Sequence, residues 1–205
     1  MPAPVSLPAS VSCLLPPAFH KEHPPKMIFN TVADIYAEND AVRGRLVARA
    51  EGLSEAQERW RAEAAAWTPA EIVEHLAIIE GNMVRLVTKL LGKAESAAGG
   101  TPAPPMPAFS LDEQAARARA QKFVAPEEIR PRGDVPLADS LAGLRASRAA
   151  LHDLRPRVET ADGTRAHYPH PFFGPLDLYQ WLAFIGVHEQ RHLDQLERLL
   201  ADAPH

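Results

Sequence analysis

The chain has 205 residues, of which 46% are hydrophobic and 23% charged, and its formal net charge at pH 7 is −4. This length and composition predict one globular domain with a full hydrophobic core. The acidic balance, without any cluster of Lys and Arg, excludes nucleic acid as an expected partner, because phosphate binding needs a basic surface. No apolar run reaches the roughly 20 residues of a membrane-spanning helix, so we expect no membrane partner.

The first 26 residues are rich in proline, which is incompatible with a helix interior or a central strand. They are expected to form a disordered tail, 1–26, ahead of a helical domain at 27–205. The segment has no basic residue before Lys21 and therefore lacks the charged start of a secretory signal. The single cysteine, Cys13, lies in this tail and excludes an internal disulfide. This fits a reducing compartment, and we expect a cytoplasmic protein.

The first half of the domain shows two long helical patterns. Apolar residues at helical spacing predict a first helix over 28–50, and Ser54 with Gln57 forms a capping box for a short helical segment after it. The second long helix has Thr68 as N-cap, Pro69 at its first position and Glu71 two residues later. We expect it to end near residue 91, before a glycine. Its inner face is predicted to read Ile72, His75, Ile78, Ile79, Asn82 and Leu86.

The second half begins with a loop. Residues 94–109 are rich in Ala, Gly and Pro and are expected to form a surface loop, followed by a short helix over 110–122. A third long helix is predicted over 137–155, ending before Pro156. A fourth is predicted from Asp177, an N-cap with Gln180 at the third position, to about residue 200. No segment reads convincingly as a strand, so the fold class expected is all-α: an up-down four-helix bundle with short extra helices.

Three histidines carry the chemistry. His188 and His192 are four residues apart, which places both imidazoles on one face of the fourth helix, and His75 lies on the inner face of the second. A lone His on an apolar face is more often a core residue with a satisfied hydrogen bond. Burying three unpaired imidazoles would be costly, however, so together they predict one divalent metal ion. Zinc or nickel is favoured over iron or manganese.

The residues from His188 to His192 also spell HExxH, the zinc-protease motif in which the Glu is the general base. Its context disfavours a protease, because only 13 residues follow His192 and none offers a third ligand on a separate helix. The default interpretation of Glu189 is a solvated or ion-paired carboxylate. Arg148 lies on the apolar stripe of the third helix and is a candidate for binding an anionic substrate, although a head group paired with a Glu is the plainer interpretation. Gln195, one turn beyond His192, is a candidate for orienting that ligand.

The segments Trp67-Thr68-Pro69-Ala70-Glu71 with His75, and Trp181 with His188 to Glu197, resemble the two histidine motifs of the DinB/YfiT-like superfamily. The resemblance covers about residues 28–200. It implies a DinB-type four-helix bundle with His75, His188 and His192 as metal ligands. Characterised relatives include thiol-dependent S-transferases, and many members have no known activity.

Three functions follow as expectations. The first is a thiol-dependent S-transferase that acts on small electrophiles, in which the metal lowers the pKa of a bound thiol. The second is a hydrolase that uses metal-bound hydroxide, and the third is a non-catalytic metal-binding protein of the stress response. Whether the protein is an enzyme at all stays open at this point. The partners expected are a small-molecule thiol or electrophile, and a second copy of the chain in a homodimer.

Overall fold

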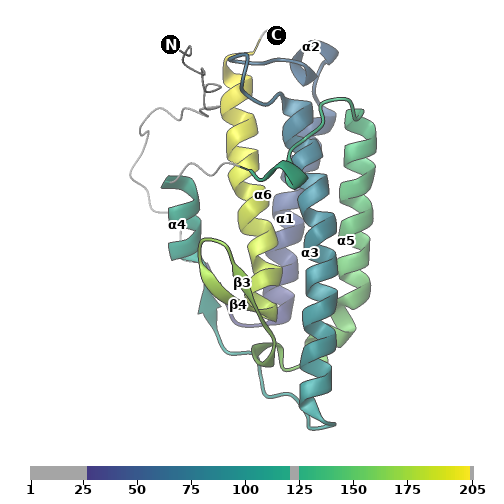
Figure 1. The fold of residues 1–205 in the computed structure, drawn as a ribbon, viewed down its shortest axis with the longest axis vertical. Helices are drawn as coiled ribbons and strands as arrows, with labels where there is room; N and C mark the ends of the chain where they lie inside the picture. The colour runs from purple at the N-terminus through teal and green to yellow at the C-terminus, as the bar shows by residue number, and fades with distance from the viewer. Residues whose placement is uncertain (1–26, 121–124, 204–205) are drawn as a thin grey trace, which may run out of the picture.

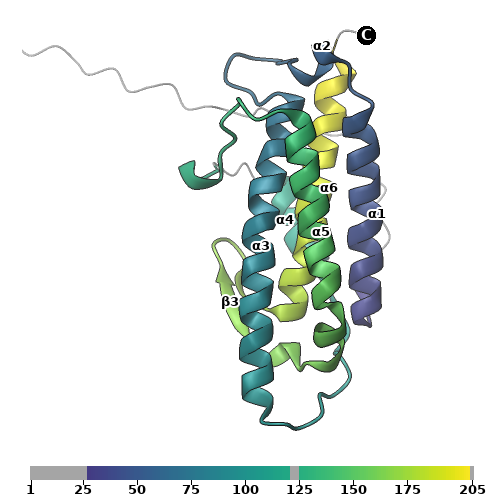
Figure 2. The ribbon, with the colours of Figure 1, turned by 90° about the vertical axis from the view of Figure 1, so that its right-hand side faces the viewer.

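The computed structural model describes residues 27–120 and 125–203. The expected disordered tail, with Cys13, lies outside the described residues, as does the expected end of the short helix at 121–122. Four long helices form a bundle: α1 (Val32–Glu51), α3 (Pro69–Ala98), α5 (Leu137–Thr160) and α6 (Leu178–Ala201), as Figures 1 and 2 show. Shorter elements connect them: β1 (Ile28–Phe29), α2 (Glu55–Glu58), β2 (Phe109–Ser110), α4 (Asp112–Ala120), the 3-10 helices η1 (Glu127–Ile129) and η2 (Gly163–Arg165), β3 (His167–His170) and β4 (Gly174–Asp177). None of the described helices combines the length and the hydropathy that a membrane span needs.

The directions of the helices refine the expected bundle. One apolar cluster joins Leu46 near the end of α1, Val73 near the start of α3, Leu141 near the start of α5 and Leu196 near the end of α6. Hence α3 and α5 run parallel to each other and antiparallel to α1 and α6 (Figure 1). The four-helix bundle is confirmed, but the plain up-down order does not hold between α3 and α5. The long connection 99–136 carries the chain back to the end where α3 begins.

Capping side chains set the helix starts. In α3 the Thr68 hydroxyl accepts from the Glu71 N–H at 3.2 Å, and the Glu71 carboxylate accepts from the Thr68 N–H at 2.7 Å. Asp177 and Gln180 form the same reciprocal pair at the start of α6. Both predicted N-termini are confirmed, as is the short capped segment, α2. The helix predicted from residue 28 instead starts at Val32, after the N-cap Thr31.

Two helices run further than the sequence predicts. α3 continues through Gly92 to Ala98 because Leu91 and Ala94 are fully buried, and this packing outweighs the roughly 1 kcal/mol that a helical glycine costs. α5 passes through Pro156 and reaches Thr160. Its last turn is held by buried Val158 and by a bidentate ion pair of the Arg157 guanidinium with the Glu95 carboxylate of α3. Tertiary packing therefore overrides both local stop signals.

The expectation of no strands was wrong. β1 pairs with β2, and β3 pairs with β4 in an antiparallel hairpin whose register places Pro169 opposite Pro175. The strands have at most four residues each, which is too short for a clear alternating pattern, and β3 and β4 each contain a proline. The hairpin precedes α6 directly and lies against its first turns (Figure 1).

The core has two apolar ends with a polar layer between them. Beside the two apolar clusters, the buried set contains charged and polar side chains from all four long helices. Those in the layer include Asn39, Arg43, His75, Glu80, Ser147, Arg148, Glu189 and His192. The predicted inner face of α3 was partly wrong, because Asn82 is exposed whereas Glu80 is fully buried.

Candidate metal centre

Helices α3 and α6 bring the three predicted histidines together. The ring centroids of His188 and His192, one turn apart on α6, are 4.6 Å apart, and the ring of His75 lies 4.9 Å from that of His192 and 5.5 Å from that of His188. The nitrogen atoms that can serve as ligands all lie within 4.8 Å of one another. Two nitrogens on one zinc ion are at most about 4.2 Å apart, since each bond is about 2.1 Å. Small side-chain adjustments therefore suffice for shared coordination.

Two of the rings are oriented by oxygen acceptors. Nδ1 of His75 lies 2.7 Å from the carbonyl oxygen of Ile129, and Nδ1 of His192 lies 2.9 Å from Oε1 of Gln195. Because an oxygen acceptor needs a hydrogen on Nδ1, each ring leaves the lone pair of Nε2 free. Metal-ligating histidines are commonly fixed in this way. Nδ1 of His188 is buried and has no protein hydrogen-bond partner.

Burial keeps the three imidazoles neutral. It lowers the pKa of His188 well below its ordinary value, and the neighbouring His192 and His75 lower it further. Burial, followed by the nearby His75, lowers the pKa of His192 to about 3. The pKa of His75 is also lowered by burial, against the opposing effect of its hydrogen bond to Ile129. Three neutral nitrogen donors, one with an orphaned buried nitrogen, fit a divalent metal of the zinc type.

A loop docked on α3 supplies the carbonyl partner of His75. The Glu74 carboxylate accepts from the backbone N–H groups of Arg132 and Gly133 at 2.8 and 3.0 Å. This holds the segment after η1 against α3 and so presents the carbonyl of Ile129 to the neighbouring His75. Sequence reasoning missed this contact, because a backbone acceptor leaves no residue-type signal.

Aromatic side chains flank the histidines. The Trp67 ring lies 4.8 Å from that of His75, and Phe184 precedes His188 by one turn of α6. The hairpin adds His170, whose ring lies 4.7 Å from that of Phe184 and 4.5 Å from that of Phe173. Burial among these rings lowers the pKa of His170 to about 4. Nothing in the sequence spacing indicated this position of His170.

Glu189 does not belong to the histidine cluster. It is fully buried, and its two carboxylate oxygens accept from Arg43 Nε at 2.5 Å and from an Arg148 terminal nitrogen at 2.9 Å. The solvated alternative considered for Glu189 was therefore wrong, and the ion-paired one is observed. Burial raises the pKa of Glu189, as does the Glu80 carboxylate, against the effect of the two guanidinium groups.

Arg148 also pairs with Asp40, at 3.3 Å. The structure thus places its guanidinium between Glu189 and Asp40. Its proposed contact with a substrate stays a prediction.

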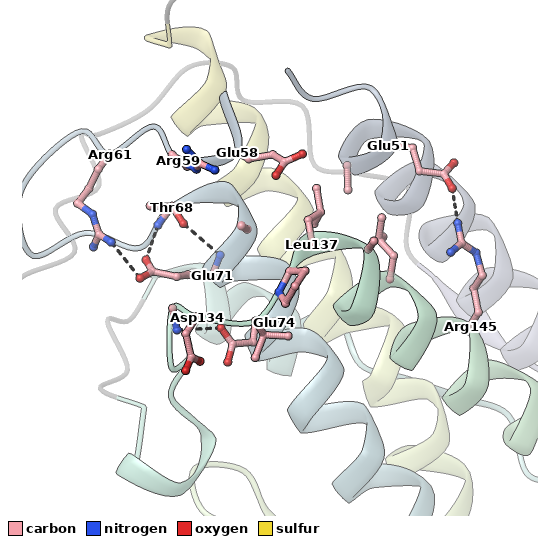
Figure 3. A pocket seen from close by; sticks show the side chains of 17 residues that line it. Glu51, Glu58, Arg59, Arg61, Thr68, Glu71, Glu74, Asp134, Leu137 and Arg145 are labelled. Carbon is pink, nitrogen blue, oxygen red and sulfur yellow. Dashed lines mark hydrogen bonds and ion pairs between the residues drawn. The ribbon is translucent and has the colours of Figure 1, made fainter. Parts of the chain in front are cut away.

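A groove of about 860 Å³ lies at the end of the bundle where α3 and α5 begin (Figure 3). Its lining includes Arg61, Glu71, Glu74, Asp134 and Leu137 but none of the three histidines. In Figure 3 Arg61 points to Glu71, an ion pair of 2.9 Å. The groove is therefore separate from the candidate metal centre.

The sequence model of the DinB superfamily matches residues 38–196, which include all three histidines. The chain belongs to the DinB superfamily. It is 26% identical over 152 residues to the uncharacterized protein YuaE of Bacillus subtilis (strain 168), a match that covers 72% of this chain and 86% of YuaE.

Two solved structures share the fold of this DinB-superfamily chain. TT2238, a four-helix bundle protein, matches with a TM-score of 0.56 and 24% identity over 82% of this chain and 99% of its own. YfiT from Bacillus subtilis, described as a probable metal-dependent hydrolase with an unusual four-helix bundle topology, matches with a TM-score of 0.58 and 16% identity. That match covers 88% of this chain and 92% of YfiT.

Proposed function

We propose that this DinB-superfamily protein is a metal-dependent enzyme in which His75, His188 and His192 hold one divalent cation. The observation that carries the proposal is the convergence of three neutral, largely buried imidazoles from two helices. His188 is the most exposed of the three, whereas His75 and His192 are 3% and 6% exposed. The edge of the centre at His188 is therefore where a small molecule would approach.

The reaction we propose is thiol-dependent S-transfer to a small electrophile. A cation held by three neutral ligands would keep its full positive charge and lower the pKa of a thiol from about 8.5, so that the thiolate prevails at neutral pH. The surroundings of the three histidines favour a thiol over the less acidic water, because Glu189 is not free to act as a base. Glu189, the carboxylate that a zinc protease would use as general base, is committed to Arg43 and Arg148. A thiol needs less help from a base than water does.

A hydrolase that activates water is the second candidate. Its support is the fold shared with YfiT, which is described as a probable metal-dependent hydrolase. A three-histidine zinc centre can activate water without a carboxylate ligand, as carbonic anhydrase does. The experiment must therefore separate the two nucleophiles.

The test begins with elemental analysis of protein purified without a nickel column, which measures the metal content of each chain. Metal-loaded protein is then incubated with a chlorodinitrobenzene or an epoxide and, in turn, cysteine, glutathione, mycothiol or bacillithiol. We expect turnover above background with one thiol, lost in His188→Ala. Turnover of an ester or amide in water alone, without thiol dependence, would replace S-transfer with the hydrolase.

A further inference from the structure

Four charged side chains are buried at mid-height in the bundle. Arg43 of α1, Glu80 of α3, Arg148 of α5 and Glu189 of α6 are 6%, 0%, 8% and 0% exposed. Each long helix contributes one of them, and two guanidinium groups face two carboxylates. Ser147 of α5 completes the layer by donating its hydroxyl to Glu80 at 3.0 Å.

Arg43 is the hub of this layer. Its Nε donates to Glu189 Oε1 at 2.5 Å, one terminal nitrogen forms an ion pair with Glu80, and the other donates to the carbonyl of Leu144. One guanidinium on α1 therefore contacts all three other long helices. The second oxygen of Glu189 is held by Arg148 at 2.9 Å.

The two carboxylates that Arg43 joins belong to the two helices that carry the histidines. Glu189 follows His188 directly on α6, and Glu80 follows His75 by five residues on α3. Because both oxygens of Glu189 are bound, rotation of α6 about its axis would break two hydrogen bonds. Sliding of α3 against α6 would break the bridge through Arg43.

Stability alone does not account for such a layer. Buried ion pairs are costly to desolvate, and replacing a whole set with apolar residues of similar volume is often neutral or stabilising. A buried polar contact can, however, specify one geometry among several similar packings, because it tolerates only one arrangement of its donors and acceptors. Glu189 is adjacent to His188 and Glu80 lies five residues after His75, so such specificity would affect the positions of the metal ligands.

We propose that Arg43 is a positioning residue which, by bridging Glu80 and Glu189, fixes the spacing and rotation of α3 and α6 and thereby the geometry of the three-histidine centre. The inference rests on the proposed metal centre for its functional meaning. It predicts that removal of the charged layer changes metal binding more than it changes stability.

The test replaces the layer as a unit, with Arg43→Met, Glu80→Leu, Arg148→Met and Glu189→Leu in one variant of the full chain. Cobalt(II) is the probe, because its visible absorption reports coordination geometry. We expect the melting temperature of the metal-free variant to lie within a few degrees of the parent's. Its cobalt affinity should be lower by about 10- to 100-fold, as for other residues that orient metal ligands, and its cobalt absorption band should change. The matched control is Glu95→Leu with Arg157→Met, which removes another α3–α5 contact at the far end of the bundle and should leave both cobalt readouts unchanged.

Unchanged affinity and absorption in the fourfold variant would overturn the inference. If that variant does not fold, Glu189→Gln keeps the volume and removes the charge, and the same cobalt readouts decide with it. The nitrogen NMR signals of the His75 and His192 rings in metal-free protein give an independent measurement, expected to shift in the layer variant but not in the control. If the parent binds no cobalt, the proposed function fails, and these ring signals alone decide whether the layer positions the histidines.

Discussion

Gln195 accepts a hydrogen bond from His192 within one turn of α6, over 2.9 Å between Oε1 and Nδ1. The contact fixes which ring nitrogen carries the hydrogen and leaves the lone pair of Nε2 free to bind a metal. We expect Gln195→Ala to weaken zinc binding by about 10- to 100-fold, the usual cost of losing a ligand-orienting partner. Competition with a chromophoric chelator measures this affinity. Equal affinities of mutant and parent would show that helix packing alone orients His192.

Removal of any one of the three imidazoles should weaken metal binding more than removal of a hydrogen-bond partner such as Gln195. We expect His75→Ala, His188→Ala and His192→Ala each to lower the metal content of protein purified without a nickel column to a small fraction of the parent's. The control is His167→Ala, since this exposed histidine lies on the hairpin outside the cluster. Full occupancy in all three single variants would rule out the centre.

The buried state of Glu189 predicts that the HExxH motif does not act as a protease. Its carboxylate is bound by Arg43 and Arg148, so it cannot serve as the base of peptide hydrolysis. We expect the parent protein to leave a casein or peptide substrate intact, and Glu189→Gln to retain metal, although with reduced affinity. Proteolysis by the parent that disappears in Glu189→Gln would contradict this arrangement.

His170 predicts a loss of stability in mild acid. Its folded-state pKa is about 4, whereas the ordinary value is 6.5, so the unfolded chain binds more protons between these values. The stabilisation is present above about pH 6.5 and is lost as the pH falls toward 4. For this half-buried ring, solvent screening reduces the effect between pH 7 and pH 5 to about 1 kcal/mol.

The measurement is urea unfolding of metal-free protein at pH 7 and pH 5, for the parent and for His170→Phe. Between pH 7 and pH 5 the unfolding free energy of the variant should fall by about 1 kcal/mol less than that of the parent. The three clustered histidines are present in both proteins, so their contribution cancels in this difference. His167→Phe, on the same hairpin but exposed, should behave like the parent. A His170→Phe variant with the parent's pH dependence would show that His170 titrates normally in the folded protein.

Local signals in the sequence predicted the starts of α3 and α6, the four-helix bundle and the placement of three histidines on inward helix faces. Thr68 and Asp177 predict the starts of their helices because a capping side chain bonds to the backbone of the first turn. His188 and His192 share a face because of helical periodicity alone, and the apolar residues beside His75 predict that it points inward.

Tertiary structure alone decided the rest. Helix α3 passes Gly92 and α5 passes Pro156, because distant packing partners outweigh a local cost of a few kcal/mol. No local signal in the sequence predicts the burial of Arg43 and Glu80, which pair with each other across two helices while Arg43 also pairs with Glu189 of a third helix. The carbonyl of Ile129 reaches His75 across 54 positions of sequence. A sequence pattern indicates interactions within one helix turn, because these depend only on neighbouring residues. The pairing of buried charges and of backbone acceptors depends instead on which helices pack side by side in the fold.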